Sequence, residues 1–278
     1  MIRSYFGLAA NPFDLGRLTL LAHQQEIFDT LRVHCQQGGF CLLLGQPGTG
    51  KSVIKHALLH HDPKRLIVAP VARTLHTYSN TLRILCAAFA IDTDGGDFKC
   101  EKRLIEHVRS LNQNGKMIVP LIDDAHLMHA DCLHKLRLLF EDFPKNHNLI
   151  LIGQPSLLGS INRIVNEEIK SRVTYSVTLT KLNPDQIRNF IRAQLDTCGL
   201  PHRTFSDEAL ELIVRTAEGI LRRARNLCVA SLLEAVRHQT KIVELPQVNA
   251  VLLQPHWRKE QDFLQPTLPE PKVTTPTN

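Results

Sequence analysis

The sequence of 278 residues contains no apolar run that approaches the roughly 18–20 residues needed to cross a bilayer. Its first residues also lack the apolar core of a secretory signal peptide. We therefore expect a cytoplasmic protein with no membrane span. The rest of the composition is globular, with 43% hydrophobic and 22% charged residues, and the length suits one to two domains.

The sequence also lacks any C-x-x-C pair, and its seven cysteines are scattered and odd in number. Because most of them fall on apolar faces, we expect reduced core residues and no disulfide framework. The fourteen histidines show no metal-ligand spacing. A structural zinc site is therefore not expected.

Acidic residues are in the minority, with 27 Asp and Glu against 33 Lys and Arg, for a formal net charge of +6. The corresponding pI is near 9.0. A basic balance favours an acidic partner, such as nucleic acid or a membrane surface, over a basic one. Many soluble proteins are mildly basic, so this feature only supports arguments made on other grounds.

What the sequence does contain is a complete phosphate-binding motif. The pattern G-x-x-x-x-G-K-[ST] is filled by Gly45, Gln46, Pro47, Gly48, Thr49, Gly50, Lys51 and Ser52. An apolar run at 40–44 precedes it and a helical pattern at 53–59 follows, which is the strand–loop–helix context of a P-loop. The alternative, a Gly-rich turn that binds nothing, is disfavoured by the full match and the correct flanks. The motif predicts a nucleotide-binding protein.

The motif assigns a task to each kind of residue. Glycines at 45, 48 and 50 allow the backbone to turn tightly and approach phosphates, because a Cβ would obstruct both. Lys51 is expected to reach the β- and γ-phosphates, and the Ser52 hydroxyl to bind Mg²⁺. All eight motif residues are predicted ATP contacts, with ATP and Mg²⁺ as the cofactors.

A second acidic motif follows the apolar run 117–122, which is suited to a central parallel strand although Pro120 cannot donate to the ladder. Asp123 comes directly after this run and is predicted to hold the Mg²⁺ bound by Ser52. Asp124 follows, where a carboxylate can orient the attacking water. Aspartate is one methylene shorter than glutamate, about 1.5 Å less reach. Alternatively, Asp124 is only the N-cap of a helix.

Apolar runs near 40–44, 65–69, 117–122 and 149–152, and a β-rich run at 173–179, alternate with helical patterns. This alternation predicts an α/β fold, a parallel sheet flanked by helices, over residues 1–182. The segment 183–254 shows helices without strands and predicts a small α-helical domain. The Pro-rich tail, 255–278, is expected to be mostly disordered. At the other end, the segment 1–22 and a helix from His23 to Val33 are either an N-terminal brace or a lid over the adenine.

Gln154 lies just after the predicted strand 149–152, at the same edge as the P-loop. A polar side chain there can sense the γ-phosphate, or it can serve only the turn. Arg172 stands directly before the last predicted strand, and Arg222 follows Gly219 at the start of a long helix.

In this order, the motifs resemble the AAA+ ATPases, and more narrowly the ExeA/GspA-type members of that family. The narrower resemblance rests on Tyr5-Phe6-Gly7-Leu8 with Asn11-Pro12-Phe13, Ile122-Asp123-Asp124-Ala125, Ile152-Gly153-Gln154-Pro155, and Gly219 followed by Arg222. It implies a P-loop AAA+ core followed by a helical lid, and an enzyme that hydrolyses ATP.

The resemblance also implies roles for single residues. Gln154 matches the sensor-1 position, and Arg172 matches an arginine finger that acts on a neighbour's site, so a homo-oligomer, ring or filament, is expected. Arg222 matches sensor 2, although Arg222, Arg223 and Arg225 can instead form a solvated basic face. Asp124 stands where the family usually has Glu, so slow hydrolysis is expected.

The family's known work divides between secretion or pilus assembly and DNA transposition. The chain ends shortly after the predicted lid, lacks a membrane segment and is basic. These features favour the transposition ATPases of the TniB/TnsC/IstB kind, with double-stranded DNA and a transposase as partners. The alternatives are an ATPase that assists secretion, and an ATP-gated switch with little hydrolysis. Arg73 and Lys145 are candidate contacts to DNA phosphates, or ordinary surface cations.

Overall fold

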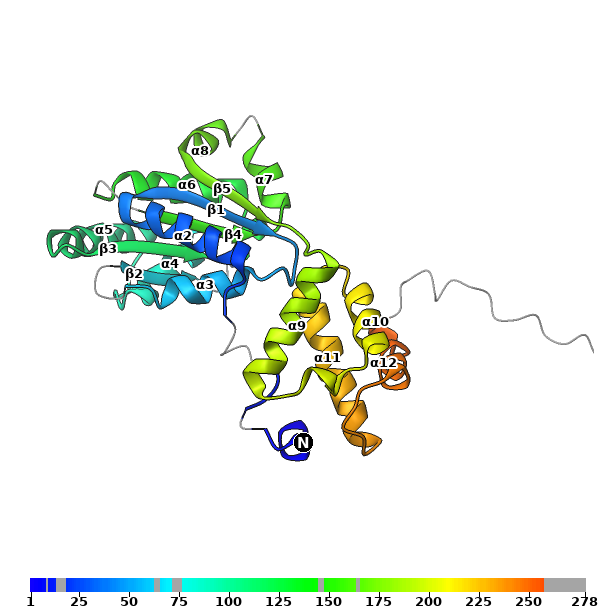
Figure 1. Ribbon diagram of the computed structural model, residues 1–278. Coiled ribbons are helices and arrows are strands. Elements are labelled where there is room, and N and C mark those ends of the chain that lie inside the picture. The colour runs from blue at the N-terminus through cyan, green and yellow to red at the C-terminus, as the bar shows by residue number, and fades with distance from the viewer. Residues whose placement is uncertain are drawn as a thin grey trace, which may run out of the picture. The chain divides into compact units, whose positions relative to one another are not determined.

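The computed structural model describes residues 1–8, 10–13, 19–62, 66–71, 77–144, 148–163 and 166–257. The chain divides into two compact units (Figure 1). The first, called the sheet unit, comprises Leu15–Asn183 and Gly219–Arg222. The second, called the helical unit, comprises Met1–Asp14, Pro184–Glu218 and Arg223–Asn278. Among the described residues, no helix has both the length and the apolar character to cross a membrane.

In the described residues of the sheet unit, five strands form one sheet in the order β2-β3-β4-β1-β5. Every neighbouring pair is parallel. The strands are β1 (Gly39–Gly45), β2 (Leu66–Val71), β3 (Met117–Ile122), β4 (Asn148–Gly153) and β5 (Val173–Leu179). The predicted α/β fold with a parallel sheet is confirmed.

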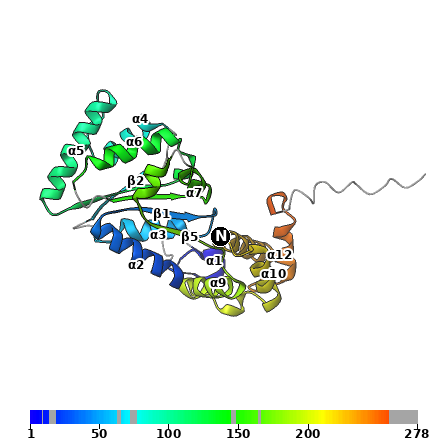
Figure 2. The ribbon, with the colours of Figure 1, turned by 90° about the horizontal axis from the view of Figure 1, so that it is seen from above.

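Helices cover both faces of this sheet (Figure 2). One face carries α2 (Ala22–Gln37) and α3 (Lys51–Leu59), and the other carries α4 (Tyr78–Ala88), α5 (Asp97–Gln113) and α6 (Ala130–Glu141). Two shorter helices, α7 (Ser156–Ile161) and α8 (Glu167–Arg172), lie between β4 and β5 in sequence.

The apolar side chains of β1 pack into two buried clusters, one on each face of the sheet. Leu42 and Leu44 pack in one buried cluster, while Cys41 and Leu43 pack in the cluster on the other face. Successive side chains of a strand point to opposite faces, so a strand covered on both sides must be apolar throughout. This is why the run that precedes the P-loop lacks polar alternation.

The seven cysteines are free and buried, as the sequence predicted. Burial raises the pKa of the Cys41 thiol to about 11, although a hydrogen bond with Thr174 opposes the shift. A thiol in this environment stays protonated near neutral pH and behaves as a small apolar side chain.

Pro120 lies inside β3, opposite Ala69 of β2. The pairing between β3 and β4 begins only after the proline, at Leu121 and Ile122. The ladder to β4 therefore starts where a backbone N–H is again present. The predicted strand at 117–122 has the same bounds in the structure.

The helical unit contains α1 (Ile2–Phe6), α9 (Pro184–Cys198), α10 (Asp207–Ala217), most of α11 (Leu221–Arg237) and α12 (Leu245–Leu252). The starts of two helices follow from sequence. Pro184 is the first residue of α9, and the Ser206 hydroxyl caps α10 by accepting from the Ala209 N–H at 3.2 Å.

The division into units differs from the predicted one at the N-terminus. The segment 1–22 was expected to be a brace of the core or a lid over the adenine, but residues 1–14 belong with the helical unit. Phe13 is 1% exposed, its ring lies 6.5 Å from the ring of Phe190, and its carbonyl accepts from Arg225 Nε at 2.8 Å. A buried aromatic ring and an anchored carbonyl explain the placement. Most of the predicted tail lies outside the described residues.

The second difference is the segment Gly219–Arg222, which belongs with the sheet unit although the sequence places it in the lid. The Leu182 N–H donates to the Gly219 carbonyl at 2.9 Å. Gly219 has φ of +78°, and a Cβ built on it would lie 2.4 Å from the Leu182 oxygen. Only glycine fits this approach without a shift of the backbone.

We predict that Gly219→Ala lowers the free energy of unfolding by about 2–4 kcal/mol, because the new methyl group meets backbone atoms at a left-handed φ. Urea unfolding followed by circular dichroism measures the change. Gly159→Ala is the matched control, because a Cβ at Gly159 in α7 meets nothing within 4 Å. It should leave the value unchanged or raise it by up to about 1 kcal/mol. Equal effects of both variants would contradict the explanation.

Candidate nucleotide site

The P-loop leads from the carboxyl end of β1 to the first turn of α3. Gly50 is the N-cap of α3 with φ of 107°, and Gly48 has φ of 83°. Both angles lie in the region that glycine enters without strain. The N–H groups of the first helical turn have no partner within the helix and carry its positive partial charge, so this end suits an anion.

The loop is closely packed on both sides. A Cβ at Gly48 would lie 2.7 Å from Arg222 Cβ, and a Cβ at Gly50 would lie 2.2 Å from Gln24 Nε2. Within the loop, Thr49 is 2% exposed and its hydroxyl donates to the Gln46 carbonyl at 2.9 Å. These contacts with Arg222 and Gln24, and the hydrogen bond within the loop, hold the P-loop in one conformation.

The Lys51 side chain folds back onto the P-loop and is partly buried. Its Nζ donates to the Gly45 carbonyl at 2.6 Å and to the Gln46 carbonyl at 3.0 Å. Burial lowers the pKa of this ammonium group, while Asp123 raises it, Arg222 lowers it and Asp124 raises it. The P-loop lysine, both acidic residues and Arg222 therefore share one electrostatic environment.

Asp123 follows β3 at the same edge of the sheet. Its N–H donates to the Val71 carbonyl at 3.0 Å, and its Oδ1 accepts from the Asp124 N–H at 2.9 Å. Its Oδ2 lies 2.5 Å from Lys55 Nζ, an ion pair that the sequence did not suggest. The sheet order β3-β4-β1 explains why Asp123 approaches the P-loop, because parallel strands end at one edge.

Asp124 is exposed and has φ of 52° and ψ of 29°, the left-handed region. It occupies the N-cap position of the short 3-10 helix Ala125–Leu127, but its side chain makes no capping hydrogen bond. Aspartate enters the left-handed region at less cost than most residues with a Cβ. The backbone at this position therefore favours Asp over Glu, independently of any chemistry.

Gln154 follows β4, between the P-loop strand and the strand that carries Asp123. Its Nε2 lies 2.9 Å from Nε2 of His126. Because an amide nitrogen only donates, the imidazole nitrogen accepts this hydrogen bond. The other ring nitrogen of His126 is buried and has no hydrogen-bond partner. His126 thus fixes the orientation of the Gln154 amide.

The three arginines at the start of α11 differ in their contacts. The Arg222 N–H donates to the Gly48 carbonyl at 3.1 Å, so this residue lies against the P-loop. Arg223 pairs with Glu218 at 2.8 Å, and Arg225 Nε binds the Phe13 carbonyl. The three arginines therefore do not form a uniform solvated basic face. Arg222 is the one that lies at the P-loop.

Arg172 lies far from the P-loop of its own chain. Phe40 pairs with Val173 and Gly45 with Leu179, so Arg172 stands at the amino ends of the strands and the P-loop at their carboxyl ends. At about 3.3 Å per residue, the separation is on the order of 20 Å. The geometry excludes Arg172 from the nucleotide site of the same subunit in this conformation.

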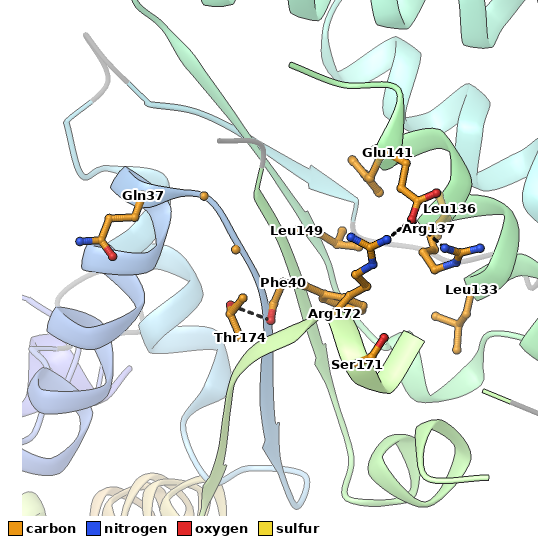
Figure 3. A pocket seen from close by; sticks show the side chains of 13 residues that line it. Gln37, Phe40, Leu133, Leu136, Arg137, Glu141, Leu149, Ser171, Arg172 and Thr174 are labelled. Carbon is orange, nitrogen blue, oxygen red and sulfur yellow. Dashed lines mark hydrogen bonds and ion pairs between the residues drawn. The ribbon is translucent and has the colours of Figure 1, made fainter. Parts of the chain in front are cut away.

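At this opposite edge, the Arg172 guanidinium points toward Glu141, which it binds at 2.8 Å (Figure 3). Arg137 also binds Glu141, at 2.7 Å, and pairs with Glu168 at 2.8 Å. A cavity of about 560 Å³ opens beside this network, with apolar walls from Phe40, Leu136 and other residues. The Arg172 side chain is 61% exposed, against 15% for Arg137.

The structure adds three polar residues that sequence reasoning missed: Gln24, Lys55 and His126. Gln24 is 1% exposed, and its Nε2 lies at the P-loop without a hydrogen-bond partner. Lys55 follows Lys51 by one helical turn, a spacing that places both on one face of α3. Nothing in the local sequence indicates their partners, which come from distant segments. The candidate DNA contacts Arg73 and Lys145 lie outside the described residues.

The donor set fits a nucleoside triphosphate with Mg²⁺. The first turn of α3 offers backbone N–H groups to a phosphate, and the Lys51 ammonium lies at the loop. Magnesium prefers oxygen ligands, which the exposed Ser52 and the Asp123 carboxylate supply.

Comparisons with known proteins show what this chain is similar to. Residues 33–161 match the family described as AAA domain. The chain is 28% identical over 254 residues to general secretion pathway protein A of Aeromonas hydrophila, covering 87% of this chain and 46% of that protein. The chain thus spans a little under half of the length of this curated relative.

Among solved structures, the Aeropyrum pernix ORC2 protein in ADPNP–ADP complexes aligns with a TM-score of 0.68 at 14% identity, covering 91% of this chain and 73% of that one. The Aeropyrum pernix ORC1 protein in complex with DNA aligns with a TM-score of 0.65 at 18% identity, covering 83% and 65%. At these identities the likeness shows the fold alone. Residues 33–161 therefore match the AAA domain family, the fold is like that of the ORC proteins, and the sequence is similar to general secretion pathway protein A.

Proposed function

We propose that the protein hydrolyses ATP at a site completed by a neighbouring copy of the same chain. The observation that carries this proposal is the position of Arg172, on the order of 20 Å from its own P-loop and largely exposed. A guanidinium at that place can reach a bound nucleotide only in another subunit. The AAA domain supports nucleotide hydrolysis in general, and the subunit-shared site is our addition.

In this proposal the residues divide the work. The backbone of 45–50 holds the phosphates, together with Lys51 and Arg222, and Gln154 contacts the γ-phosphate in the orientation set by His126. Ser52 and Asp123 would hold Mg²⁺, which would neutralise phosphate charge. Asp124 accepts a proton from the attacking water. The neighbour's Arg172 neutralises charge that develops in the transition state.

We further propose that the assembled protein binds duplex DNA and regulates or recruits a transposase. The net charge of +6 supports a polyanionic partner. A cytoplasmic location belongs to the same proposal. The second candidate is assistance to secretion, which the similarity to general secretion pathway protein A favours.

Binding to duplex DNA separates these candidates. With a non-hydrolysable ATP analogue at about 50 mM salt, we expect the protein to assemble on a labelled duplex, and log affinity to fall linearly with log salt concentration. Fluorescence anisotropy measures affinity, and electron microscopy shows the assembly. Lys51→Ala is the matched control and should lose the dependence on nucleotide. Absence of DNA binding under these conditions would overturn the transposition proposal and leave the secretion candidate.

Asp124 decides between an active ATPase and an ATP-gated switch. We expect slow turnover in the parent protein with DNA present, and an increase of roughly tenfold or more in Asp124→Glu, because the longer carboxylate reaches the water. Phosphate release measures the rate. Asp124→Asn is the control, since it keeps the left-handed preference and removes the base. Fast turnover in the parent with no gain in Asp124→Glu would show that the shorter carboxylate is harmless.

A further inference from the structure

The carboxylate of Asp123 already holds a cation from its own chain. Lys55 Nζ lies 2.5 Å from Asp123 Oδ2, and each side chain is only 21% exposed. The other oxygen of the carboxylate accepts from the Asp124 N–H at 2.9 Å. Both oxygens of the predicted metal ligand are therefore engaged by protein groups.

The two partners of this ion pair differ in the length of their side chains. Asp123 follows β3 directly, and its N–H is fixed to the Val71 carbonyl at 3.0 Å. Lys55 reaches the carboxylate with a four-carbon chain from the middle of α3. The lysine ammonium can therefore withdraw by rotation of its side chain, whereas the carboxylate stays at the edge of the sheet.

A neighbouring lysine on the same helix has a different task. Lys51, one turn earlier, binds the Gly45 and Gln46 carbonyls within the P-loop. The motif accounts for Lys51, but no part of the P-loop pattern calls for a cation four residues later. Lys55 is thus an additional positive charge, directed at the residue expected to hold Mg²⁺.

We propose that Lys55 competes with Mg²⁺ for the Asp123 carboxylate and so sets the Mg²⁺ concentration that tight nucleotide binding requires. It is a positioning residue that acts through Asp123. The inference rests on the proposed ATP·Mg²⁺ site. A cation that occupies Oδ2 must leave before a metal ion can use that oxygen, and the loss of this ion pair subtracts from the free energy of metal binding.

The test is a Mg²⁺ concentration series at a fixed concentration of a fluorescent ATP analogue, read by anisotropy. Lys55→Met removes the charge and keeps the length of the side chain. We expect the half-saturating Mg²⁺ concentration to fall by about threefold to tenfold, the range of a partly exposed ion pair. An unchanged or higher half-saturating concentration would overturn the proposal. Lys55→Gln provides a second neutral variant if the methionine variant does not fold.

Two controls locate the effect. Lys102→Met makes the same chemical change on α5, where Lys102 is 68% exposed, and should leave the Mg²⁺ dependence at the parental value. In an Asp123→Asn background, Lys55→Met should have no further effect, because the shared carboxylate is gone. An equal shift in that background would show that Lys55 acts elsewhere. If the parent protein binds no nucleotide at any Mg²⁺ concentration, the proposed ATP site fails, which is a distinct outcome.

Discussion

The parallel pairing of β1 with β4 and β5 is the constraint on which the candidate site depends. It places the P-loop and Gln154 at one edge of the sheet, with Asp123 one strand further along. The same register places Arg172 at the opposite edge, because α8 ends where β5 begins. The two halves of the proposed reaction centre are thus separated within one subunit by the length of a strand. Only association of subunits can bring such halves together.

A second constraint lies in the backbone after β3. Asp124 adopts a left-handed conformation, and its N–H donates to the Asp123 carboxylate. Aspartate is thus a favourable residue for this backbone. Lys55 holds the other oxygen of the same carboxylate. The backbone conformation at Asp124 and the ion pair of Asp123 with Lys55 therefore account for part of the arrangement of this acidic pair, apart from any role in hydrolysis.

Local patterns made much of this structure predictable. The strands at 117–122 and 173–179 have their predicted bounds, because an apolar run marks the first and a run rich in β-branched residues marks the second. Helix α8 was missed, since it buries only Ile169 and shows no apolar periodicity. The placement of residues 1–14 and the Lys55–Asp123 pair depend on contacts between distant segments, which one sequence does not encode in any local signal.

The central claim, a site shared between subunits, is tested most directly by mixing two inactive variants. Lys51→Ala lacks a working P-loop but offers Arg172, whereas Arg172→Ala keeps the P-loop and lacks the arginine. At equal amounts and random assembly, about one quarter of the interfaces combine an intact P-loop with an intact arginine. We predict that each variant alone is inactive, that Arg172→Ala still binds nucleotide, and that ATP turnover reappears in the mixture. Absence of turnover at every mixing ratio would contradict the account, as would full activity of Arg172→Ala alone.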